Sequence, residues 1–346
     1  MQFPPTVRAF GGEIRLGADA LLEKPRNLSK DCLAFSHARA ALIWLNSRAG
    51  PFDCVMLSAY TCPSVPRMYS NLGCSLIFVD LFSDRWEEMI RRATGRLLVL
   101  VPAFLGHDVG VDLLGISKSL ENKGIVVVDA AQTAFGHETI SVPESVAVLS
   151  CPRKCVAVGD GAILRWSELT DVDHAAVAKM PWATNAVAAK LAARALCAWR
   201  SPAVEPEMLR LNAEAELAWP DYPHRMSDSG TWFFSWTDPV AHARRRWENW
   251  ATLSRGLAGR VEIVERYGGT PYNFSILVNQ RDEILKRLHS QRVFATALWP
   301  DSVHSGNEHP VAADFTRRLI GLPIDQSYSV EDMDEILARV LGSLCQ

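Results

Sequence analysis

Four short apolar runs recur in the first half of the chain, each separated from the next by a polar stretch. The runs cover residues 54–57, 75–79 (SLIFV), 97–101 (LLVLV) and 125–128 (IVVV). The stretches between them, such as residues 84–94 and 113–122, have compositions compatible with helices. Continuous β-branched runs that alternate with helices are typical of a mostly parallel sheet buried on both faces. The sequence therefore predicts an α/β fold in which helices sandwich a mostly parallel central sheet.

The second half of the chain has a different texture, which predicts a smaller α+β lobe. Helices are expected at residues 206–217 and 239–257, with a loop through Pro220, Pro223 and Gly230 between them. The later segments expected to form strands or helices are residues 261–264, 274–278, 281–290 and 330–344. Because 346 residues are many for one domain, we expect a large α/β domain over 1–230 and a small α+β domain over 231–346.

Composition and charge argue against several classes of function. A net charge of -3 gives no basic surface for nucleic acid or for an anionic membrane. The most apolar stretch, residues 97–105, is far shorter than the ~20 residues that span a bilayer. The start of the chain lacks the pattern of a secretory signal, and the eight cysteines form no C-x-x-C pair. We therefore expect a cytoplasmic protein with reduced thiols and no metal centre.

Polar residues directly follow two of the predicted strands. The run at 125–128 leads into Asp129-Ala130-Ala131-Gln132, and a further run at 145–149 leads through Ser150 to Lys154. Open parallel sheets bind ligands at the carboxyl ends of their strands, so these side chains mark the expected site. The sequence contains neither a G-x-G-x-x-G fingerprint nor a G-x-x-x-x-G-K-[ST] loop, which argues against a dinucleotide or a nucleoside triphosphate.

These side chains supply the groups that pyridoxal phosphate requires. The cofactor needs a lysine amine for its aldehyde, a carboxylate for its ring nitrogen, and hydroxyl and N–H donors for its phosphate. Lys154, Asp129, Ser150 and a helix that starts near His37 could provide them, and Gln132 could meet the ring oxygen. Each residue alone also has an ordinary explanation, as a strand cap, a solvated lysine or a turn serine. Their joint order along the chain is much more specific.

Six segments resemble motifs of the DegT/DnrJ/StrS family of pyridoxal-phosphate-dependent aminotransferases, which have the aspartate-aminotransferase fold. IVVVDAAQTAFG is similar to the family's V-[IV]-x-D-A-A-Q-x-x-G, and SCPRKCVAVGDGAIL is similar to its S-x-x-x-K-x-x-x-x-G-D-G-G. The other four segments are HARAALIWL, MLSAYTCPSVP, PHRMSDSG and GLPIDQSYSVEDM. Together they extend from about residue 33 to about residue 340, so the resemblance covers nearly the whole chain.

The resemblance implies a role for four residues of the two most specific segments. Lys154 would be the Schiff-base lysine and would carry the proton between the substrate carbon and the cofactor. We expect its pKa to be lowered by burial and by the cationic bound cofactor. Asp129 would pair with the pyridine nitrogen, Gln132 would face the ring oxygen, and Ser150 would bind the phosphate.

The phosphate-binding and ring-stacking positions depart from the family pattern. Ala38 and Arg39 stand where the family more often has glycine and a hydroxyl residue, so backbone N–H contacts would survive and Arg39 would add a charge. Thr61 matches the family's threonine. The next residue is a cysteine where many members have an aromatic ring, and Phe104 or Tyr60 could fill that role.

The resemblance also implies contact with a second subunit. Arg225 keeps the arginine that reaches the partner subunit's site, although Pro223 replaces the family's loop asparagine. The expected assembly is a homodimer with shared active sites. It would transfer an amino group from an amino-acid donor, glutamate or glutamine, to a carbonyl acceptor. The acceptor would be a keto-sugar nucleotide or an intermediate of a specialised pathway.

Three alternatives remain open. The first is a lyase, a dehydratase or other carbon-bond chemistry with the same cofactor, and Lys154 argues against the family's dehydratases because they replace the lysine. The second is a non-catalytic binding module on the same scaffold. The intact set of Asp129, Gln132, Ser150 and Lys154 argues against that module. The third, a nicotinamide-dependent enzyme, would need the glycine fingerprint that the sequence lacks.

Overall fold

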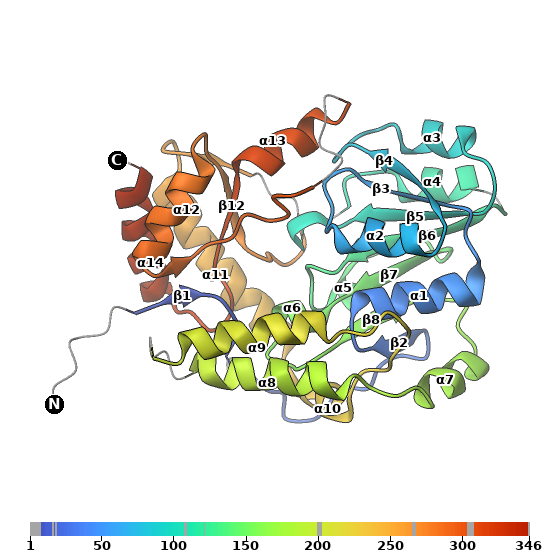
Figure 1. Ribbon diagram of the computed structural model, residues 1–346, viewed down its shortest axis with the longest axis horizontal. Coiled ribbons are helices and arrows are strands. Elements are labelled where there is room, and N and C mark those ends of the chain that lie inside the picture. The colour runs from blue at the N-terminus through green and yellow to red at the C-terminus, as the bar shows by residue number, and fades with distance from the viewer. Residues whose placement is uncertain are drawn as a thin grey trace.

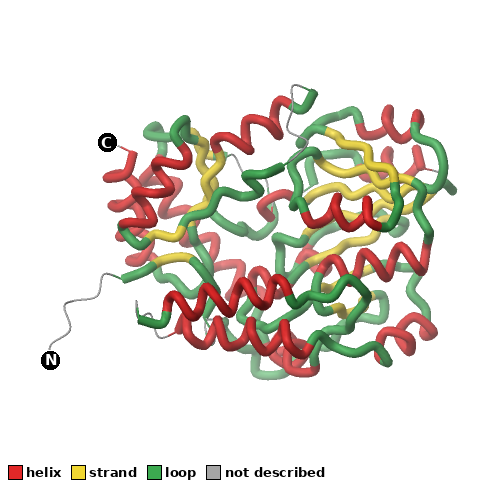
Figure 2. Tube along the Cα trace, in the orientation of Figure 1, coloured by secondary structure: helices red, strands yellow, loops and turns green. Residues whose placement is uncertain are grey.

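The computed structural model describes residues 8–15, 17, 19–106, 109–120, 122–198, 203–264, 268–302 and 308–344. The chain forms two lobes, a large one around a seven-stranded sheet and a smaller one that holds the C-terminal helices (Figure 1). Figure 2, in the same orientation, shows helices flanking the strands of both lobes. Within the described segments, every helix is too short or too polar to span a bilayer.

The central sheet has the strand order β2-β8-β7-β6-β5-β3-β4. Its strands are β2 (Cys32–Phe35), β8 (Ala162–Arg165), β7 (Val146–Ser150), β6 (Gly124–Ala130), β5 (Leu97–Pro102), β3 (Cys54–Ser58) and β4 (Ser75–Val79). The five strands from β7 to β4 are parallel, whereas β8 runs antiparallel to both of its neighbours, β7 and β2. The predicted mostly parallel sheet is therefore confirmed, with one reversed strand near its edge.

Each face of this sheet has its own hydrophobic core. The helices on one face are α1 (Ala38–Ala49), α2 (Ser64–Asn71) and α7 (Asp171–Ala178). The helices on the other face are α3 (Trp86–Arg92), α4 (Leu113–Leu120) and α5 (Gly136–Thr139). Val127 of β6 belongs to the first core and its neighbour Val128 to the second. Successive residues alternate in this way because side chains of a β-strand point to opposite faces.

The small lobe is built on two short sheets. Strands β9 (Glu262–Ile263), β10 (Phe274–Leu277) and β12 (Leu319–Leu322) form an antiparallel sheet in the order β12-β10-β9. Strand β1 (Phe10–Gly11) pairs parallel with β11 (Val293–Phe294). The surrounding helices are α11 (Pro239–Leu257), α12 (Arg281–Ser290) and α14 (Val330–Leu344). All three helices begin and end where the sequence predicts.

Further elements lie around the junction of the two lobes. Helices α8 (Thr184–Ala198) and α9 (Glu205–Leu217) pack side by side below the short α6 (Pro152–Cys155) in Figure 1. The remaining elements are η1 (Phe104–Gly106), α10 (Asp228–Trp236) and α13 (Pro310–Arg318). An aromatic cluster joins the lobes here, because Phe315 of α13 lies with its ring centroid 5.7 Å from Tyr60 and 5.8 Å from Phe104.

The predicted loop through Gly230 is wrong at its end, where the chain forms α10. The hydroxyl of Ser227 caps this helix and accepts the N–H of Gly230 at 3.0 Å. The same hydroxyl and the backbone N–H of Ser227 donate to the buried carboxylate of Asp160, at 2.6 and 2.7 Å. A Cβ at position 230 would lie 2.2 Å from that carboxylate. The glycine is therefore required by a close contact inside a helix rather than by a turn.

The N-terminal strand departs from the predicted division of the chain at residue 230. Phe10 of β1 is fully buried in the core of the small lobe. Phe234 of α10 instead stacks on Phe135 of the large lobe, with ring centroids 5.2 Å apart. Strand pairing joins segments that are distant in sequence, so the small lobe includes the start of the chain as well as its end.

Candidate active site

A cavity of about 380 Å³ lies where the carboxyl ends of β5 and β6 meet the start of α1 and the turn after β7. Seven of the nine predicted site residues line it: Ala38, Arg39, Thr61, Phe104, Asp129, Gln132 and Lys154. The small lobe contributes Tyr272, Leu298 and Trp299 to another side of the cavity. Within the described residues, no three potential metal ligands among His, Cys, Asp and Glu come together.

Lys154 projects into this cavity from the one-turn helix α6, which follows β7 directly. Burial lowers the pKa of its amine, but Cys151, Cys62, Tyr272 and Asp129 together outweigh burial and raise the pKa. The predicted lowered pKa is therefore not a property of the chain by itself. The predicted lowering includes the effect of a bound cationic cofactor and stays a prediction.

Asp129 faces the same cavity from the end of β6, the strand next to β7. Its Oδ1 accepts the backbone N–H of Ala131 at 3.0 Å. Burial raises the pKa of the Asp129 carboxyl, and the opposing effects of Lys154 and of the Ala131 N–H do not cancel the rise. A buried carboxylate of this kind is stabilised by a cation or by a further hydrogen-bond donor.

The N-terminus of α1 opens onto the cavity without a side-chain cap. Arg39, in the first turn of this helix, has neither a hydrogen bond nor an ion pair with the described residues. His37, at the cap position, is buried, and its ring lies 5.1 Å from that of Trp219. Burial, with smaller contributions from Arg153, Arg39 and His224, holds the pKa of His37 well below its ordinary value, so the ring is neutral at pH 7. Free N–H groups and an unpaired guanidinium favour an anion here.

The side chain of Gln132 is fixed by the backbone of η1. Its Oε1 accepts the N–H of Leu105 at 2.7 Å, and Leu105 has a positive φ of 55°. Because the backbone N–H is a donor, the amide oxygen must face it, which leaves the NH₂ group of Gln132 for another partner. This orientation agrees with the predicted donor to a ring oxygen, which stays a prediction.

Phe104 and Tyr60 are packed in the aromatic cluster between the lobes. Their ring centroids are 5.5 Å apart in an edge-to-face arrangement, and the phenol of Tyr60 donates to the carbonyl of Leu298. Both line the cavity, together with Thr61 and the half-buried Cys62. Phe104 and Tyr60 therefore lie beside the cavity, and their contacts with a cofactor ring stay predictions.

Ser150 lies on the opposite face of the sheet from Asp129, and its predicted contact with a phosphate stays a prediction. The register pairs Leu149 with Asp129 and Ser150 with Ala130, so Ser150 points away from the side of the sheet on which Asp129 lies. The hydroxyl of Ser150 is fully buried and lies 2.7 Å from Nδ1 of His137. Ser150 does not contribute to the lining of the cavity.

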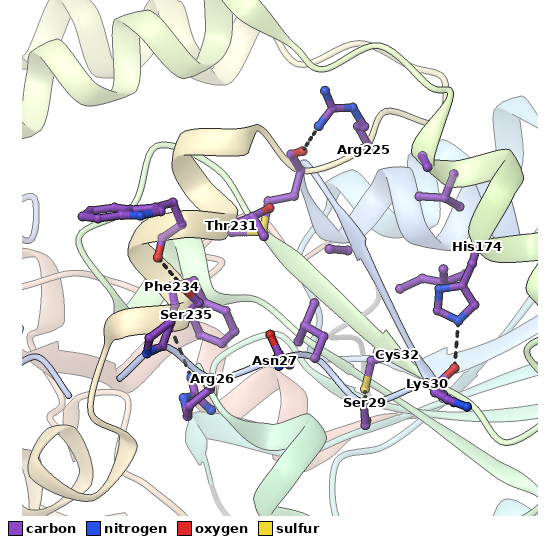
Figure 3. Close-up of a pocket in the computed structure, with 18 of the residues that line it drawn as sticks. Arg26, Asn27, Ser29, Lys30, Cys32, His174, Arg225, Thr231, Phe234 and Ser235 are labelled. Atoms are coloured by element: carbon purple, nitrogen blue, oxygen red, sulfur yellow. Dashed lines mark hydrogen bonds between the residues drawn. The ribbon is translucent and has the colours of Figure 1, made fainter. Parts of the chain in front are cut away.

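Arg225 also lies outside this cavity. It borders a second cavity, of about 900 Å³, between residues 25–34, which include the start of β2, and helices α7 and α10 (Figure 3). Its guanidinium donates to the Asp228 carboxylate at 2.6 Å and to the Met180 carbonyl at 3.1 Å. Its predicted contact with a partner subunit stays a prediction.

A network of charged residues forms a third side of the first cavity, and no sequence motif indicates it. Lys190 of α8 donates to Glu13 at 2.7 Å and to Asn212 of α9 at 2.5 Å. Arg153 donates to Glu216 of α9 at 3.0 Å. Burial raises the pKa of Glu216, but Arg153 and Lys190 outweigh burial and lower the pKa to about 2. Asn212 and Glu216 of α9 are four residues apart, a spacing that places two side chains on the same face of a helix. The spacing does not show which residues that face contacts.

Known proteins match this chain in structure but not in sequence. No protein-family model matches the sequence, and no curated protein matches it. A DegT DnrJ EryC1 StrS aminotransferase from Brucella abortus is 14% identical with a TM-score of 0.60, over 90% of this chain and 85% of that chain. The putative sugar aminotransferase Spr1654 from Streptococcus pneumoniae, in its PMP form, is 13% identical with a TM-score of 0.62, over 93% and 94%.

A third solved structure extends the comparison. PseC of Helicobacter pylori, an aminotransferase involved in the biosynthesis of pseudoaminic acid, is 11% identical with a TM-score of 0.58, over 93% of each chain. The chain therefore has the fold of these aminotransferases over most of its length. The fold predicted from the sequence is confirmed.

Proposed function

We propose that the chain binds pyridoxal 5′-phosphate in the cavity beside Lys154 and acts as an aminotransferase. One observation carries the proposal: Lys154 and Asp129, which follow neighbouring parallel strands, line one cavity together with the uncapped N-terminus of α1. These groups match the aldehyde, the ring nitrogen and the phosphate of the cofactor. The Streptococcus pneumoniae aminotransferase with the same fold is known in PLP and PMP forms, which supports the choice of cofactor.

The cavity fits this cofactor in charge as well as in position. Arg39 and the start of α1 offer positive charge to a phosphate, and the buried Nε2 of His37 lacks a hydrogen-bond partner among the described residues. Asp129 is a buried carboxyl with a raised pKa, and a cationic ring nitrogen beside it would offset the cost of its charge. Both ends of the cofactor would thus meet the charge that they require.

Bound pyridoxal phosphate would supply an electron-accepting ring that stabilises negative charge on an adjacent carbon. Asp129 would keep the ring nitrogen protonated through its carboxylate. Nζ of Lys154 would hold the aldehyde carbon in the resting protein and, once displaced by the amino donor, would remove the proton from the donor's α-carbon. The NH₂ group of Gln132 would donate to the ring oxygen, and Arg39 would bind the phosphate.

The substrates are proposed to be small molecules. The donor would be an amino acid, glutamate or glutamine, and the acceptor a keto-sugar nucleotide or an intermediate of a specialised pathway. Spr1654 is a putative sugar aminotransferase and PseC is an aminotransferase involved in the biosynthesis of pseudoaminic acid, which supports a sugar-like acceptor.

A homodimer is part of the proposal, with Arg225 reaching the partner subunit's site. Three large apolar side chains near α10, Leu21, Trp232 and Phe233, are exposed. A cluster of exposed apolar residues supports a protein partner on this face, which also contains the cavity shown in Figure 3. The seven described cysteines are free thiols, which supports the proposed cytoplasmic location.

The proposal is tested by the absorption spectrum of the purified protein, with and without added pyridoxal phosphate. We expect a visible band that borohydride removes, and mass spectrometry should then place the reduced adduct on Lys154. The buried Lys190 lines the same cavity and serves as an internal comparison for the peptide mapping. Added glutamate or glutamine should convert the band to that of the amine form.

Two variants complete the experiment. Lys154→Ala should lose the band, whereas Lys118→Ala, on the exposed side of α4, should keep it. A wild-type protein that takes up no pyridoxal phosphate would refute the proposed function. A band that forms on Lys154 but does not respond to any amino donor would favour the alternative of carbon-bond chemistry.

A further inference from the structure

The turn that carries Lys154 has an unusual arrangement of its backbone carbonyl groups. Helix α6 contains only four residues, so its last carbonyls cannot form the i to i+4 hydrogen bonds of a longer helix. The carbonyls of Arg153, Cys155 and Val156, which surround Lys154, instead accept hydrogen bonds from two buried arginines. These arginines come from α8 and α11, helices that lie far from the turn in the sequence.

Arg194 of α8 binds two of these carbonyls. Its Nη2 donates to the Arg153 carbonyl at 2.6 Å, and its Nη1 donates to the Val156 carbonyl. Its Nε donates to the Glu13 carboxylate at 3.2 Å, which balances its charge. Only 1% of Arg194 is exposed, so this hydrogen-bond set is almost completely excluded from water.

Arg246 of α11 binds the third carbonyl and connects the turn to the small lobe. Its Nη2 donates to the Cys155 carbonyl at 3.2 Å, and its Nη1 donates to the Tyr272 carbonyl at 2.8 Å. Its Nε donates to Gln326 at 3.0 Å, and Gln326 itself donates to the Cys155 carbonyl at 2.9 Å. Arg246 is as completely buried as Arg194.

We propose that Arg194 and Arg246 are positioning residues that fix the backbone of the Lys154 turn, so that the amine is held at one place in the cavity. The inference rests on the proposed function, in which the Lys154 amine attaches the cofactor and then moves a proton. A lysine side chain is flexible, so the position of its amine depends on a rigid backbone. Two planar guanidinium groups with several donors each, one from α8 and one from α11, provide that rigidity.

Helix α11 offers a matched control for a purely structural role. Asn249 lies three residues after Arg246 and is also fully buried. Its Nδ2 donates to the carbonyls of Ile324, Asp325 and Tyr328, at 3.1 to 3.3 Å, none of which belongs to the Lys154 turn. Asn249→Ala should therefore destabilise the protein without a specific effect on Lys154.

The first measurement is the rate at which pyridoxal phosphate attaches to the cofactor-free protein, followed by absorbance. We expect Arg246→Lys and Arg194→Lys to slow attachment by tenfold or more, since a displacement of about 1 Å in a reacting group can reduce a rate about a hundredfold. Asn249→Ala should attach the cofactor at the wild-type rate. Gln326→Leu, which removes one of the two donors to the Cys155 carbonyl, serves as a milder variant if an arginine variant does not fold.

The second measurement needs no cofactor. Acylation of Lys154 is followed by mass spectrometry as a function of pH, which reports the pKa of its amine. In the wild type this pKa should be raised, because Cys151, Cys62, Tyr272 and Asp129 lie close to the amine and together outweigh the effect of burial. In the two arginine variants it should move down toward the ordinary value of lysine, and in Asn249→Ala it should not move.

The outcomes separate this inference from the proposed function. If wild-type protein attaches no pyridoxal phosphate but the acylation midpoints differ as expected, the proposed function fails and the positioning role stands. If Asn249→Ala slows attachment and moves the midpoint as much as the arginine variants do, the positioning role is overturned. It is equally overturned if neither arginine variant nor Gln326→Leu changes the rate or the midpoint.

Discussion

Charged side chains on two sides of one cavity differ in whether they have partners within the chain. On the strand-end side, the amine of Lys154 and the guanidinium of Arg39 have no hydrogen bond or ion pair among the described residues. On the α8–α9 side, Lys190 is bound by Glu13 at 2.7 Å and by Asn212 at 2.5 Å, and Glu216 lies 3.5 Å away. Buried charges are costly unless they are paired, so the first side is suited to a ligand and the second to stabilising the fold.

The sharpest test of this comparison replaces the two cavity lysines in turn. Lys154→Ala removes the amine that attaches the cofactor and moves the proton, so turnover should fall on the order of a thousandfold or more, with little loss of stability. Lys190→Met leaves the buried Glu13 with one cation fewer, so the free energy of unfolding should fall by about 3–5 kcal/mol, while the cofactor still attaches. Turnover assays measure the loss of activity, and urea unfolding measures the loss of stability. If the two variants lose activity and stability to the same extent, the two sides of the cavity do not differ in role.

Glu13→Gln tests the α8–α9 side through its dependence on pH. Burial would raise the pKa of Glu13, but Arg194 and Lys190 outweigh burial and hold the pKa below its ordinary value of 4.5. A carboxyl with a lowered pKa stabilises the folded state above its unfolded pKa, and this stabilisation is lost as the pH falls toward the folded pKa. The wild-type free energy of unfolding should therefore decrease below about pH 4.5. Glu13→Gln should lose about 3 kcal/mol at pH 7 and show a shallower decrease in acid.

The measurement for Glu13 is a series of urea unfolding curves between pH 7 and pH 3. Glu216 has a lowered pKa for a similar reason, so part of the acid dependence should persist in Glu13→Gln. If the free energy of unfolding depends on pH in the same way in the wild type and the variant, Arg194 and Lys190 do not lower the pKa of Glu13.

Arg39→Ala tests the strand-end side. Loss of one charge-assisted hydrogen bond should weaken the binding of pyridoxal phosphate about tenfold, whereas pyridoxal, which lacks the phosphate, should bind as before. Arg48 provides the control, because it lies at the other end of α1 and pairs with Asp173 at 2.7 Å. Titration of the cofactor-free protein by absorbance measures both. If Arg39→Ala weakens pyridoxal to the same extent, Arg39 does not bind the phosphate.

Ser150→Ala should have the smallest effect. The Ser150 hydroxyl bonds to His137 on the other face of the sheet, so the affinity for pyridoxal phosphate should not change. The loss of a buried hydrogen bond should cost about 1 kcal/mol in the free energy of unfolding. If Ser150→Ala lowers the affinity for the cofactor tenfold, the Ser150 hydroxyl binds the phosphate, as the sequence predicts.

The elements predicted best are those whose residues form a regular pattern over a short stretch. The helices at 239–257, 281–290 and 330–344 are confirmed at both ends, and the strand that leads to Asp129 is confirmed as β6, with Asp129 near its carboxyl end. Hydrophobic periodicity encodes these features locally. The pairing of β1 with β11 and that of β8 with β2 escaped prediction because they join segments that are distant in the sequence.

The residues of the site also differ in how far the sequence could identify them. Asp129 and Lys154 could be identified because Asp129 directly follows one apolar run and Lys154 lies in the short turn after another. The face on which Ser150 lies could not be predicted, because a difference of one residue in a strand reverses the direction of a side chain, and only the register with β6 shows which residue lies on the side of Asp129.

The sequence by itself determined the alternation of strands and helices in the large lobe, the class of the fold, and the lysine and carboxylate near the strand ends. The tertiary structure alone decided which charges are paired, since Glu13, Lys190 and Arg194 meet only when the N-terminal segment packs against α8. It also brought Arg194 and Arg246 to the turn of Lys154. The physical reason is the separation along the sequence over which each effect acts. Periodicity acts over a few residues, whereas buried ion pairs and capped carbonyls join segments that only the folded chain brings within hydrogen-bonding distance.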